Sequence, residues 1–185
     1  MSPRLVVLCG TSYSGKSSFA TALADHLDAH VVSLDEINER RGLWGGDGIP
    51  VEEWQTTHAV ATAEVRERLA AAPGPARSTP APDHGSARPP QTEPQPTVIL
   101  DDTSSPRFLR DGWRALAAEL GAEFHLIHLD VDHATIHQRR TANQADPHRR
   151  HVTDAVLAQH LDDFEPPTPD ENPIRVHPGD PLPHL

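Results

Sequence analysis

The segment Gly10-Thr-Ser-Tyr-Ser-Gly-Lys-Ser17 decides how this chain is interpreted, because it fits the pattern G-x-x-x-x-G-K-[S/T] in full. It lies between a short apolar run, Leu5 to Cys9, and an amphipathic stretch, Ser17 to Leu27. Glycines at both ends of such a loop let successive backbone N–H groups turn toward one anion, and the following helix adds its positive N-terminal dipole. The sequence therefore predicts a strand, a phosphate-binding loop and a helix, in that order.

The loop contains Lys16, which is the one lysine among the sixteen Lys and Arg residues of the chain. An ammonium group on a long flexible stem can reach the β- and γ-phosphates of a nucleotide, and the hydroxyl of Ser17 can bind Mg²⁺. The residues that we expect to contact the nucleotide are Gly10, Thr11, Ser12, Tyr13, Ser14, Gly15, Lys16, Ser17 and Ser18.

Strands and helices alternate through the rest of the chain. Short apolar runs predict strands at residues 5–9, 30–34, 97–100, 123–129 and 174–176. Helical periodicity predicts helices at residues 17–27, 36–41, 51–72, 107–120, 132–145 and 152–164. This order calls for a parallel sheet with helices on both faces. We expect a single domain over residues 1–185, an α/β three-layer sandwich of the P-loop NTPase type with five parallel strands and a small arginine-bearing lid.

Two segments interrupt this pattern. Residues 73–96 hold eight of the nineteen prolines, and such a segment buries too little apolar surface to offset its ordering entropy. We expect a flexible insertion there, with a polyproline docking segment as the alternative. Residues 166–185 are acidic and rich in proline, and we expect them to form a loosely held tail.

Composition excludes several classes of protein. Asp and Glu outnumber Lys and Arg by 27 to 16, and the resulting net charge of −11 argues against a protein that binds long nucleic acid. A single cysteine, Cys9, excludes an intramolecular disulfide framework. The chain has no apolar run of about 18 residues, and its first apolar run is too short for a signal-peptide core. We therefore expect a cytoplasmic protein without a membrane span. Among scattered histidines, His148 and His151 are a weak indication of a metal.

Carboxylates follow two of the predicted strands. Asp35 comes after the strand at residues 30–34, and Asp101 and Asp102 come after the strand at residues 97–100. The carboxyl ends of parallel strands meet at the edge where the phosphate-binding loop lies. We expect Asp35 to act as a base toward a hydroxyl group, and Asp102 or Asp101 to bind Mg²⁺ or orient an acceptor. Aspartate also caps helices and turns, and that role remains open for Asp35 and Asp101.

Arginines gather after residue 138. Arg139, Arg140, Arg149 and Arg150 surround a polar break that contains Pro147. A lid with these side chains would place guanidinium groups over a triphosphate, with Arg139 the first candidate and Arg140 beside it. A solvated basic surface is the alternative.

Other basic and aromatic residues have less specific positions. Arg40 and Arg41 follow the predicted base closely, and we expect them to hold an acceptor. The nearby Trp44 and Trp54 could stack on that acceptor, but packing onto the domain is the favoured interpretation. An exposed helix surface is expected for the arginines at positions 107, 110 and 114.

The chain resembles the P-loop kinases of the polynucleotide-kinase-like group. The resemblance is carried by residues 8–17, 32–37 and 98–104, by the helix from Arg107, by the Arg139 segment and by the helix that ends in Phe164-Glu-Pro-Pro167. The opening Val-Val-Leu-Cys-Gly is also similar to kinases that phosphorylate aminoacylated tRNA. This resemblance implies ATP and Mg²⁺ as ligands. It also implies that Asp35 is the base, that Asp102 and Thr103 lie beside the acceptor, and that Arg139 is the lid arginine.

Two positions depart from that group. Asn38 stands where the polynucleotide kinases have an arginine that holds a substrate phosphate, and Asn143 or Gln144 stands where a second lid arginine falls. With the acidic net charge, these departures disfavour a polynucleotide. We expect transfer of the ATP γ-phosphate to a hydroxyl of a small metabolite or natural product. The alternatives are a polynucleotide or tRNA-linked hydroxyl as acceptor, and an ATP-hydrolysing switch protein that yields no phosphorylated product.

Overall fold

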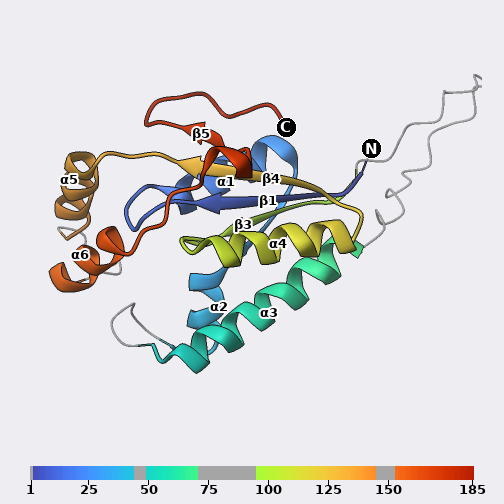
Figure 1. The fold of residues 1–185 in the computed structure, drawn as a ribbon, viewed down its shortest axis with the longest axis horizontal. Coiled ribbons are helices and arrows are strands. Elements are labelled where there is room, and N and C mark those ends of the chain that lie inside the picture. Colours follow the sequence, from blue (N-terminus) through green and yellow to red (C-terminus); the bar gives the residue numbers. More distant parts are fainter. Residues whose placement is uncertain (1, 44–48, 71–94, 145–152) are drawn as a thin grey trace, which may run out of the picture.

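The computed structural model describes residues 2–43, 49–70, 95–144 and 153–185 (Figure 1). The predicted proline-rich insertion lies outside the described residues except for residues 95 and 96, as do Trp44, His148, Arg149, Arg150 and His151. In chain order, the elements are β1 (Arg4–Cys9), α1 (Lys16–Leu27), β2 (His30–Ser33), α2 (Leu34–Arg40), α3 (Val51–Ala70), β3 (Thr97–Asp101), α4 (Arg107–Glu119), β4 (Glu123–Leu129), α5 (His133–Gln144), α6 (Asp154–Asp162), the 3₁₀ turn η1 (Pro169–Glu171) and β5 (Ile174–Val176). Within these ranges, no helix is long and apolar enough to cross a membrane.

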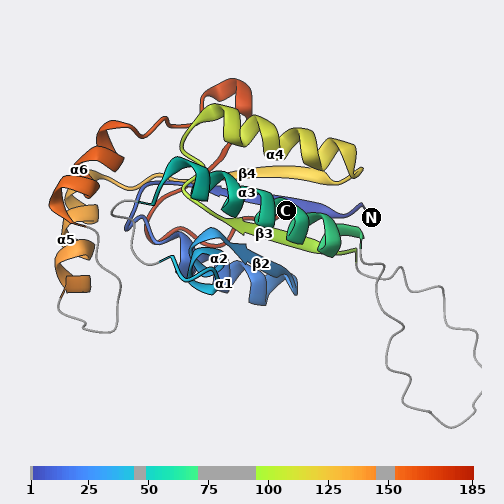
Figure 2. The same ribbon diagram turned by 90° about the horizontal axis from the view of Figure 1, so that it is seen from below.

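The five strands form one parallel sheet in the order β2-β3-β1-β4-β5. β1 is central, with Val7 paired to Leu100 of β3 and to Leu126 of β4. Parallel strands end at a common edge, and α5 and α6 lie beyond that edge in both views (Figure 1 and Figure 2). The predicted α/β sandwich with five parallel strands is therefore confirmed.

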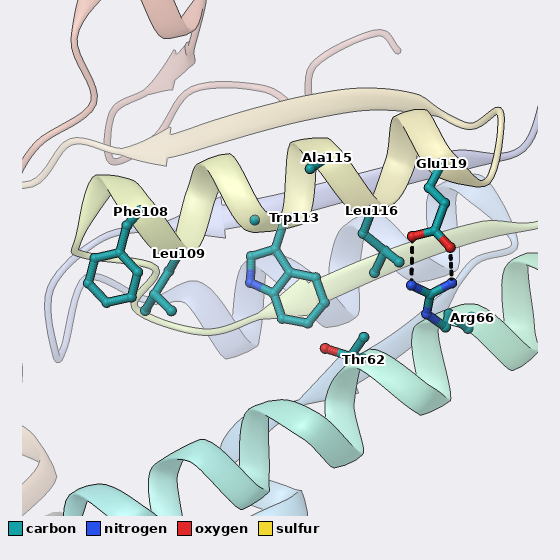
Figure 3. Close-up of a pocket in the computed structure, with 9 residues that line it drawn as sticks. Thr62, Arg66, Phe108, Leu109, Trp113, Ala115, Leu116 and Glu119 are labelled. Atoms are coloured by element: carbon teal, nitrogen blue, oxygen red, sulfur yellow. Dashed lines mark hydrogen bonds and ion pairs between the residues drawn. The ribbon is translucent and has the colours of Figure 1, made fainter.

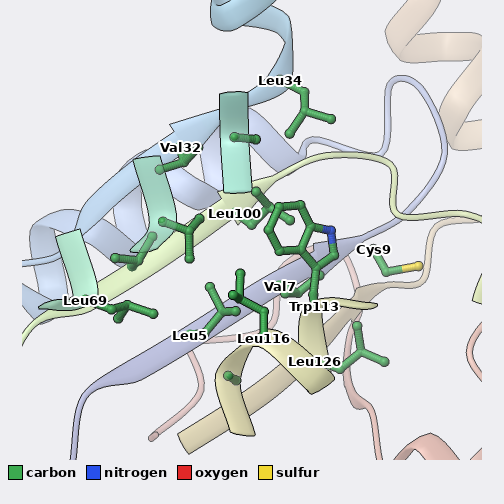
Figure 4. Close-up of a cluster of buried hydrophobic side chains, with 14 of the residues drawn as sticks. Leu5, Val7, Cys9, Val32, Leu34, Leu69, Leu100, Trp113, Leu116 and Leu126 are labelled. Carbon is green, nitrogen blue, oxygen red and sulfur yellow. The ribbon is translucent and has the colours of Figure 1, made fainter. Parts of the chain in front are cut away.

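Each face of the sheet buries its own apolar cluster, since successive strand residues point to opposite sides. On one face, Leu5 and Val7 pack with Trp113 of α4 and with apolar residues of α3 (Figure 4). On the other face, Val6 and Leu8 pack with Leu23 of α1 and with the end of the chain. These two clusters place helices on both sides of the sheet, and they bury β1, the strand that leads into the phosphate-binding loop.

Helices α3 and α4 leave a groove between them of about 330 Å³ (Figure 3). Trp113 and Leu116 lie along its floor, and Phe108 lies at one end with 72% of its surface exposed. At the other end, Arg66 donates two hydrogen bonds to the carboxylate of Glu119, at 2.6 and 2.7 Å. None of the residues that line this groove belongs to the phosphate-binding loop.

The expectation of a loosely held tail is wrong for residues 166–176. Glu171 is only 3% exposed, and β5 pairs with β4 through Val176, which is also buried. Leu182 and Leu185 pack against the cluster on the α1 face of the sheet. Proline and acidic composition suggested a solvated segment, but a few apolar side chains and one buried carboxylate are enough to dock it. The expected edge strand at residues 174–176 is confirmed.

The expectation of an exposed arginine surface on α4 is wrong for Arg110, which is completely buried. Its guanidinium donates to both carboxylate oxygens of Glu171, at 2.6 and 2.9 Å. Its remaining nitrogen donates to the carbonyl groups of Ser104 and Glu165, each at 3.0 Å. By contrast, Arg107 is exposed and pairs with Asp170. Arg110 therefore joins the tail to the loop that follows β3.

Candidate active site

The phosphate-binding loop connects β1 to α1 and requires glycine at both of its ends. At Gly10, an added Cβ would lie 2.8 Å from Ser14 Oγ and 3.2 Å from the carbonyl oxygen of Leu129. Gly15 has φ of 96°, in the left-handed region that favours glycine, and Tyr13 within the loop has φ of 62°. The N–H of Gly10 donates to the carbonyl of Thr103 at 3.1 Å. That bond ties the start of the loop to the segment after β3.

Lys16 lies inside the loop, and its Nζ donates to the carbonyl of Thr11 at 2.9 Å. Burial lowers the pKa of Lys16, while the nearby carboxylates of Asp101, Asp102 and Asp35 raise it. The structure thus brings together the lysine and the three carboxylates that were expected at this edge. A triphosphate would meet one ammonium group among several carboxylates.

Asp101 is the carboxylate that faces Ser17. It is the last residue of β3, it is buried, and it is hydrogen bonded to the Ser17 side chain. Burial raises the pKa of Asp101, and the charge of Lys16 and the bond from Ser17 lower it. Asp102 instead accepts hydrogen bonds within its own loop, from Thr103 N at 2.7 Å and from Ser104 Oγ at 3.3 Å.

A carboxylate beside a hydroxyl is a donor set that suits Mg²⁺, which prefers oxygen ligands. No group of three or more His, Cys, Asp or Glu side chains in the described part of the chain is arranged to bind a metal. Mg²⁺ in kinase sites commonly takes one or two protein oxygens, and the nucleotide phosphates and water supply the others. Asp101 and Ser17 fit that description, and Asp102 fits it less well.

Asp35 lies in the first turn of α2, which begins one residue after β2 ends. Ser33 caps this helix by accepting a hydrogen bond from Glu36 N at 3.4 Å. α2 buries Leu34 and Ile37 and turns its acidic side outward. That side opens on a cavity of about 260 Å³, which is lined by Ser17, Thr21, Val31, Ser33, Asp35, Glu36, Glu39 and Asp101.

Arg40 and Arg41 do not line this cavity, because α3 holds both of them. Arg40 pairs with Glu64, and Arg41 pairs with Glu53 and donates to Thr57 Oγ1 at 2.6 Å. Asn38, at the position where polynucleotide kinases carry an arginine, is buried and accepts a hydrogen bond from the hydroxyl of Thr57. The predicted contact of Arg40 and Arg41 with an acceptor stays a prediction, since the structure pairs both side chains with α3 in this arrangement of described residues. The side chains of Asn38, Arg40 and Arg41 thus connect α2 to α3.

Of the two adjacent lid arginines, only Arg139 reaches the loop. Its Nη1 donates to the carbonyl of Ser14 at 2.6 Å and to that of Tyr13 at 3.3 Å. An added Cβ at Gly15 would lie 3.2 Å from the same nitrogen. Arg140 instead pairs with Asp154 and so joins α5 to α6.

Sequence reasoning missed a second contact with the loop, which is made by α6; α5 and α6 together are called the lid helices below. His160 of α6 lies with Nδ1 2.9 Å from Ser12 Oγ, and the two groups form a hydrogen bond. One histidine among thirteen in the sequence gave no signal that could single it out, because the contact depends on how α6 docks.

The structure combines a parallel sheet, this phosphate-binding loop, a carboxylate at a strand end and an arginine that contacts the loop. Together, these features are typical of P-loop kinase folds. Residues 5–167 match the family AAA_33, described as an AAA domain, and the chain belongs to that family. The tRNA dimethylallyltransferase 1 of Pelobacter propionicus is 40% identical over 48 residues. That match covers 26% of this chain and only 16% of the transferase.

Solved structures share the fold over almost the whole chain. Kti12 from Chaetomium thermophilum, in complex with ADP-AlF3, is 13% identical with a TM-score of 0.67, and the match covers 96% of this chain and 90% of Kti12. A gluconokinase from Sinorhizobium meliloti 1021 is 17% identical with a TM-score of 0.58, and the match covers 97% of this chain and 85% of the gluconokinase. At these identities, the likeness concerns the fold.

Proposed function

We propose that this protein transfers the γ-phosphate of ATP to a hydroxyl group of a small-molecule acceptor. The observation that carries the proposal is one cavity lined by Ser17, Asp35 and Asp101, directly beside Lys16 of the phosphate-binding loop. It places an oxygen donor set for Mg²⁺ and a separate carboxylate within one space. Membership of a P-loop family and the complex of Kti12 with ADP-AlF3 support a nucleotide as the ligand of the loop.

Each residue has a role that follows from its position. The backbone N–H groups of the loop and Lys16 hold the phosphates, and Ser17 and Asp101 would hold Mg²⁺, which neutralises phosphate charge when bound. Asp35 accepts the proton of the acceptor hydroxyl as its oxygen attacks the γ-phosphorus. The new O–P bond forms as the bond from the γ-phosphorus to the bridging oxygen breaks, and ADP leaves with that electron pair.

In this proposal, Arg139 stabilises the charge that develops during transfer. In this structure its guanidinium donates to two carbonyl groups of the loop. A phosphate oxygen is a stronger acceptor than a neutral carbonyl, because charge-assisted hydrogen bonds are roughly twice as strong. A short rotation of the side chain toward a bound triphosphate is therefore favourable.

The cavity supports a small hydroxylated acceptor over a polynucleotide. Its lining is made of hydroxyls and carboxylates together with Val31. The arginines next to it, Arg40 and Arg41, are paired with carboxylates of α3. A chain of phosphates would meet like charge at this surface, and the net charge of −11 adds to the repulsion.

The test is incubation with ATP labelled at the γ-phosphate, Mg²⁺ and a library of hydroxylated small molecules, with products resolved by mass. The proposal predicts a product that is heavier than its acceptor by one phosphate and that forms only when that acceptor is present. Release of labelled inorganic phosphate alone, at a rate raised by a protein or tRNA partner, would instead identify a nucleotide-hydrolysing switch. Labelling of a polynucleotide 5′-hydroxyl would assign the acceptor to nucleic acid.

A further inference from the structure

Three successive residues of the phosphate-binding loop receive contacts from the lid helices. Arg139 of α5 binds the carbonyl groups of Tyr13 and Ser14, and His160 of α6 binds the hydroxyl of Ser12. The contact of His160 is the one that the proposed mechanism does not use. It joins side chains that are 148 positions apart in the chain, so it depends on how α6 packs beside the phosphate-binding loop.

The α6 helix that carries His160 is fixed at both ends. At its start, Asp154 pairs with Arg140 of α5, and Leu157 in its first turns is buried. Just beyond its end, the hydroxyl of Ser105 donates to the carbonyl of Asp163 at 3.4 Å. Two residues further on, the carbonyl of Glu165 accepts a hydrogen bond from the buried Arg110. These anchors hold His160 in place beside the loop.

Ser12 lies where the γ-phosphate end of a nucleotide is expected. The loop lysine of such motifs reaches the β- and γ-phosphates, and here Lys16 Nζ lies 2.9 Å from the carbonyl of Thr11, the residue before Ser12. A hydroxyl and an imidazole beside that point can both donate hydrogen bonds to phosphate oxygens. ADP lacks the group that they would contact.

Resting on the proposed function, we infer that His160 and Ser12 together contact the γ-phosphate and make the protein prefer ATP over ADP. His160 is thus a specificity-determining residue of the nucleotide site, supplied by α6 and outside the loop motif.

The experiment measures dissociation constants of fluorescent mant-ATP and mant-ADP with Mg²⁺, for the full chain and for variants. We expect His160→Ala to weaken mant-ATP binding about tenfold and to change mant-ADP binding less than about twofold, since one charge-assisted hydrogen bond is lost. His160→Asn keeps a polar atom near the position of Nδ1 and is expected to recover most of the ATP affinity. His137→Ala removes an exposed imidazole from α5 and is the matched control, with no change expected.

Ser12→Ala removes the same hydrogen bond by changing the loop and not α6. It therefore gives an independent test if the His160 variants misfold. We expect it to reduce the preference for ATP as His160→Ala does, and the two changes combined to be less than additive. Equal weakening of both nucleotides, no change in either, or full additivity would overturn the inference and leave the nucleotide site intact. A wild-type protein that binds neither nucleotide would instead refute the proposed function.

Discussion

The buried pair of Arg110 and Glu171 provides a quantitative test of how the fold holds the site. Arg110 is completely buried and Glu171 nearly so, and two hydrogen bonds of 2.6 and 2.9 Å connect them. Arg110 also binds the carbonyl of Ser104 in the loop between β3 and α4. Glu171→Gln keeps the size of the side chain and removes its charge, so the buried guanidinium loses the carboxylate with which it is paired.

Two estimates of the effect agree. Removing one partner of a buried ion pair destabilises proteins by about 3–5 kcal/mol. Burial raises the pKa of Glu171, but hydrogen bonds from Arg110 and Thr168 outweigh it and lower the pKa from 4.5 to about 2. A shift of one pKa unit corresponds to about 1.4 kcal/mol, so this shift adds about 3 kcal/mol to the free energy of unfolding at neutral pH. For a chain of this length, we expect the midpoint of thermal unfolding to fall by about 10 °C.

The assay is thermal and urea unfolding followed by circular dichroism at pH 7, with the urea series repeated at lower pH. Because the folded pKa is depressed, the contribution of Glu171 is complete above pH 4.5 and disappears as the pH falls toward 2. The difference between wild type and Glu171→Gln should therefore shrink across that range.

Two control variants separate the buried charge from other effects. Asp170→Asn breaks a solvent-exposed pair with Arg107, and because exposed pairs contribute about 0–1 kcal/mol, it should shift the midpoint far less. The double variant Arg110→Met, Glu171→Leu removes both charges and should recover much of the loss. A Glu171→Gln protein within 1 kcal/mol of wild type at pH 7 would refute the reasoning.

Three further predictions concern the site itself. Asp101→Asn should raise the Mg²⁺ concentration needed for half-maximal phosphate transfer, and an unchanged Mg²⁺ titration would remove Asp101 from the metal site. Gly15→Ala should lower both stability and ATP affinity, since the residue has φ of 96° and a Cβ would lie 3.2 Å from Arg139. Gly42→Ala is the control with φ of 75° and open space around it, and it should lower stability alone. Arg139→Met should slow transfer about tenfold or more, and an unaltered rate would exclude this arginine from the reaction.

The strand, loop and helix of residues 5–27 are predictable from the sequence because their signals are local. Each signal lies within a few neighbouring positions. Apolar β-branched residues predict the strand, glycines at fixed spacing predict the loop, and an amphipathic repeat predicts the helix. The meeting of Asp35 and Asp101 at one edge also follows from sequence, since parallel strands end at a common edge.

The rest depends on contacts between distant segments. Nothing near Arg110 in sequence shows that Glu171 returns to meet it, so α4 was interpreted as exposed there. Arg40 and Arg41 were assigned to an acceptor because they follow Asp35, but carboxylates of α3 hold them. The choice between Asp101 and Asp102 turns on which residue ends β3, and strand ends are uncertain by a residue or two in sequence.

The most direct test of the central claim is the rate of phosphate transfer by Asp35→Asn, with the acceptor found by its mass gain of one phosphate. This substitution removes the carboxylate that we propose as the acceptor of the hydroxyl proton, and it keeps the shape of the side chain. We predict a fall in transfer rate of about 100-fold or more, with ATP affinity unchanged. A variant that binds ATP and transfers phosphate at the wild-type rate would contradict the account.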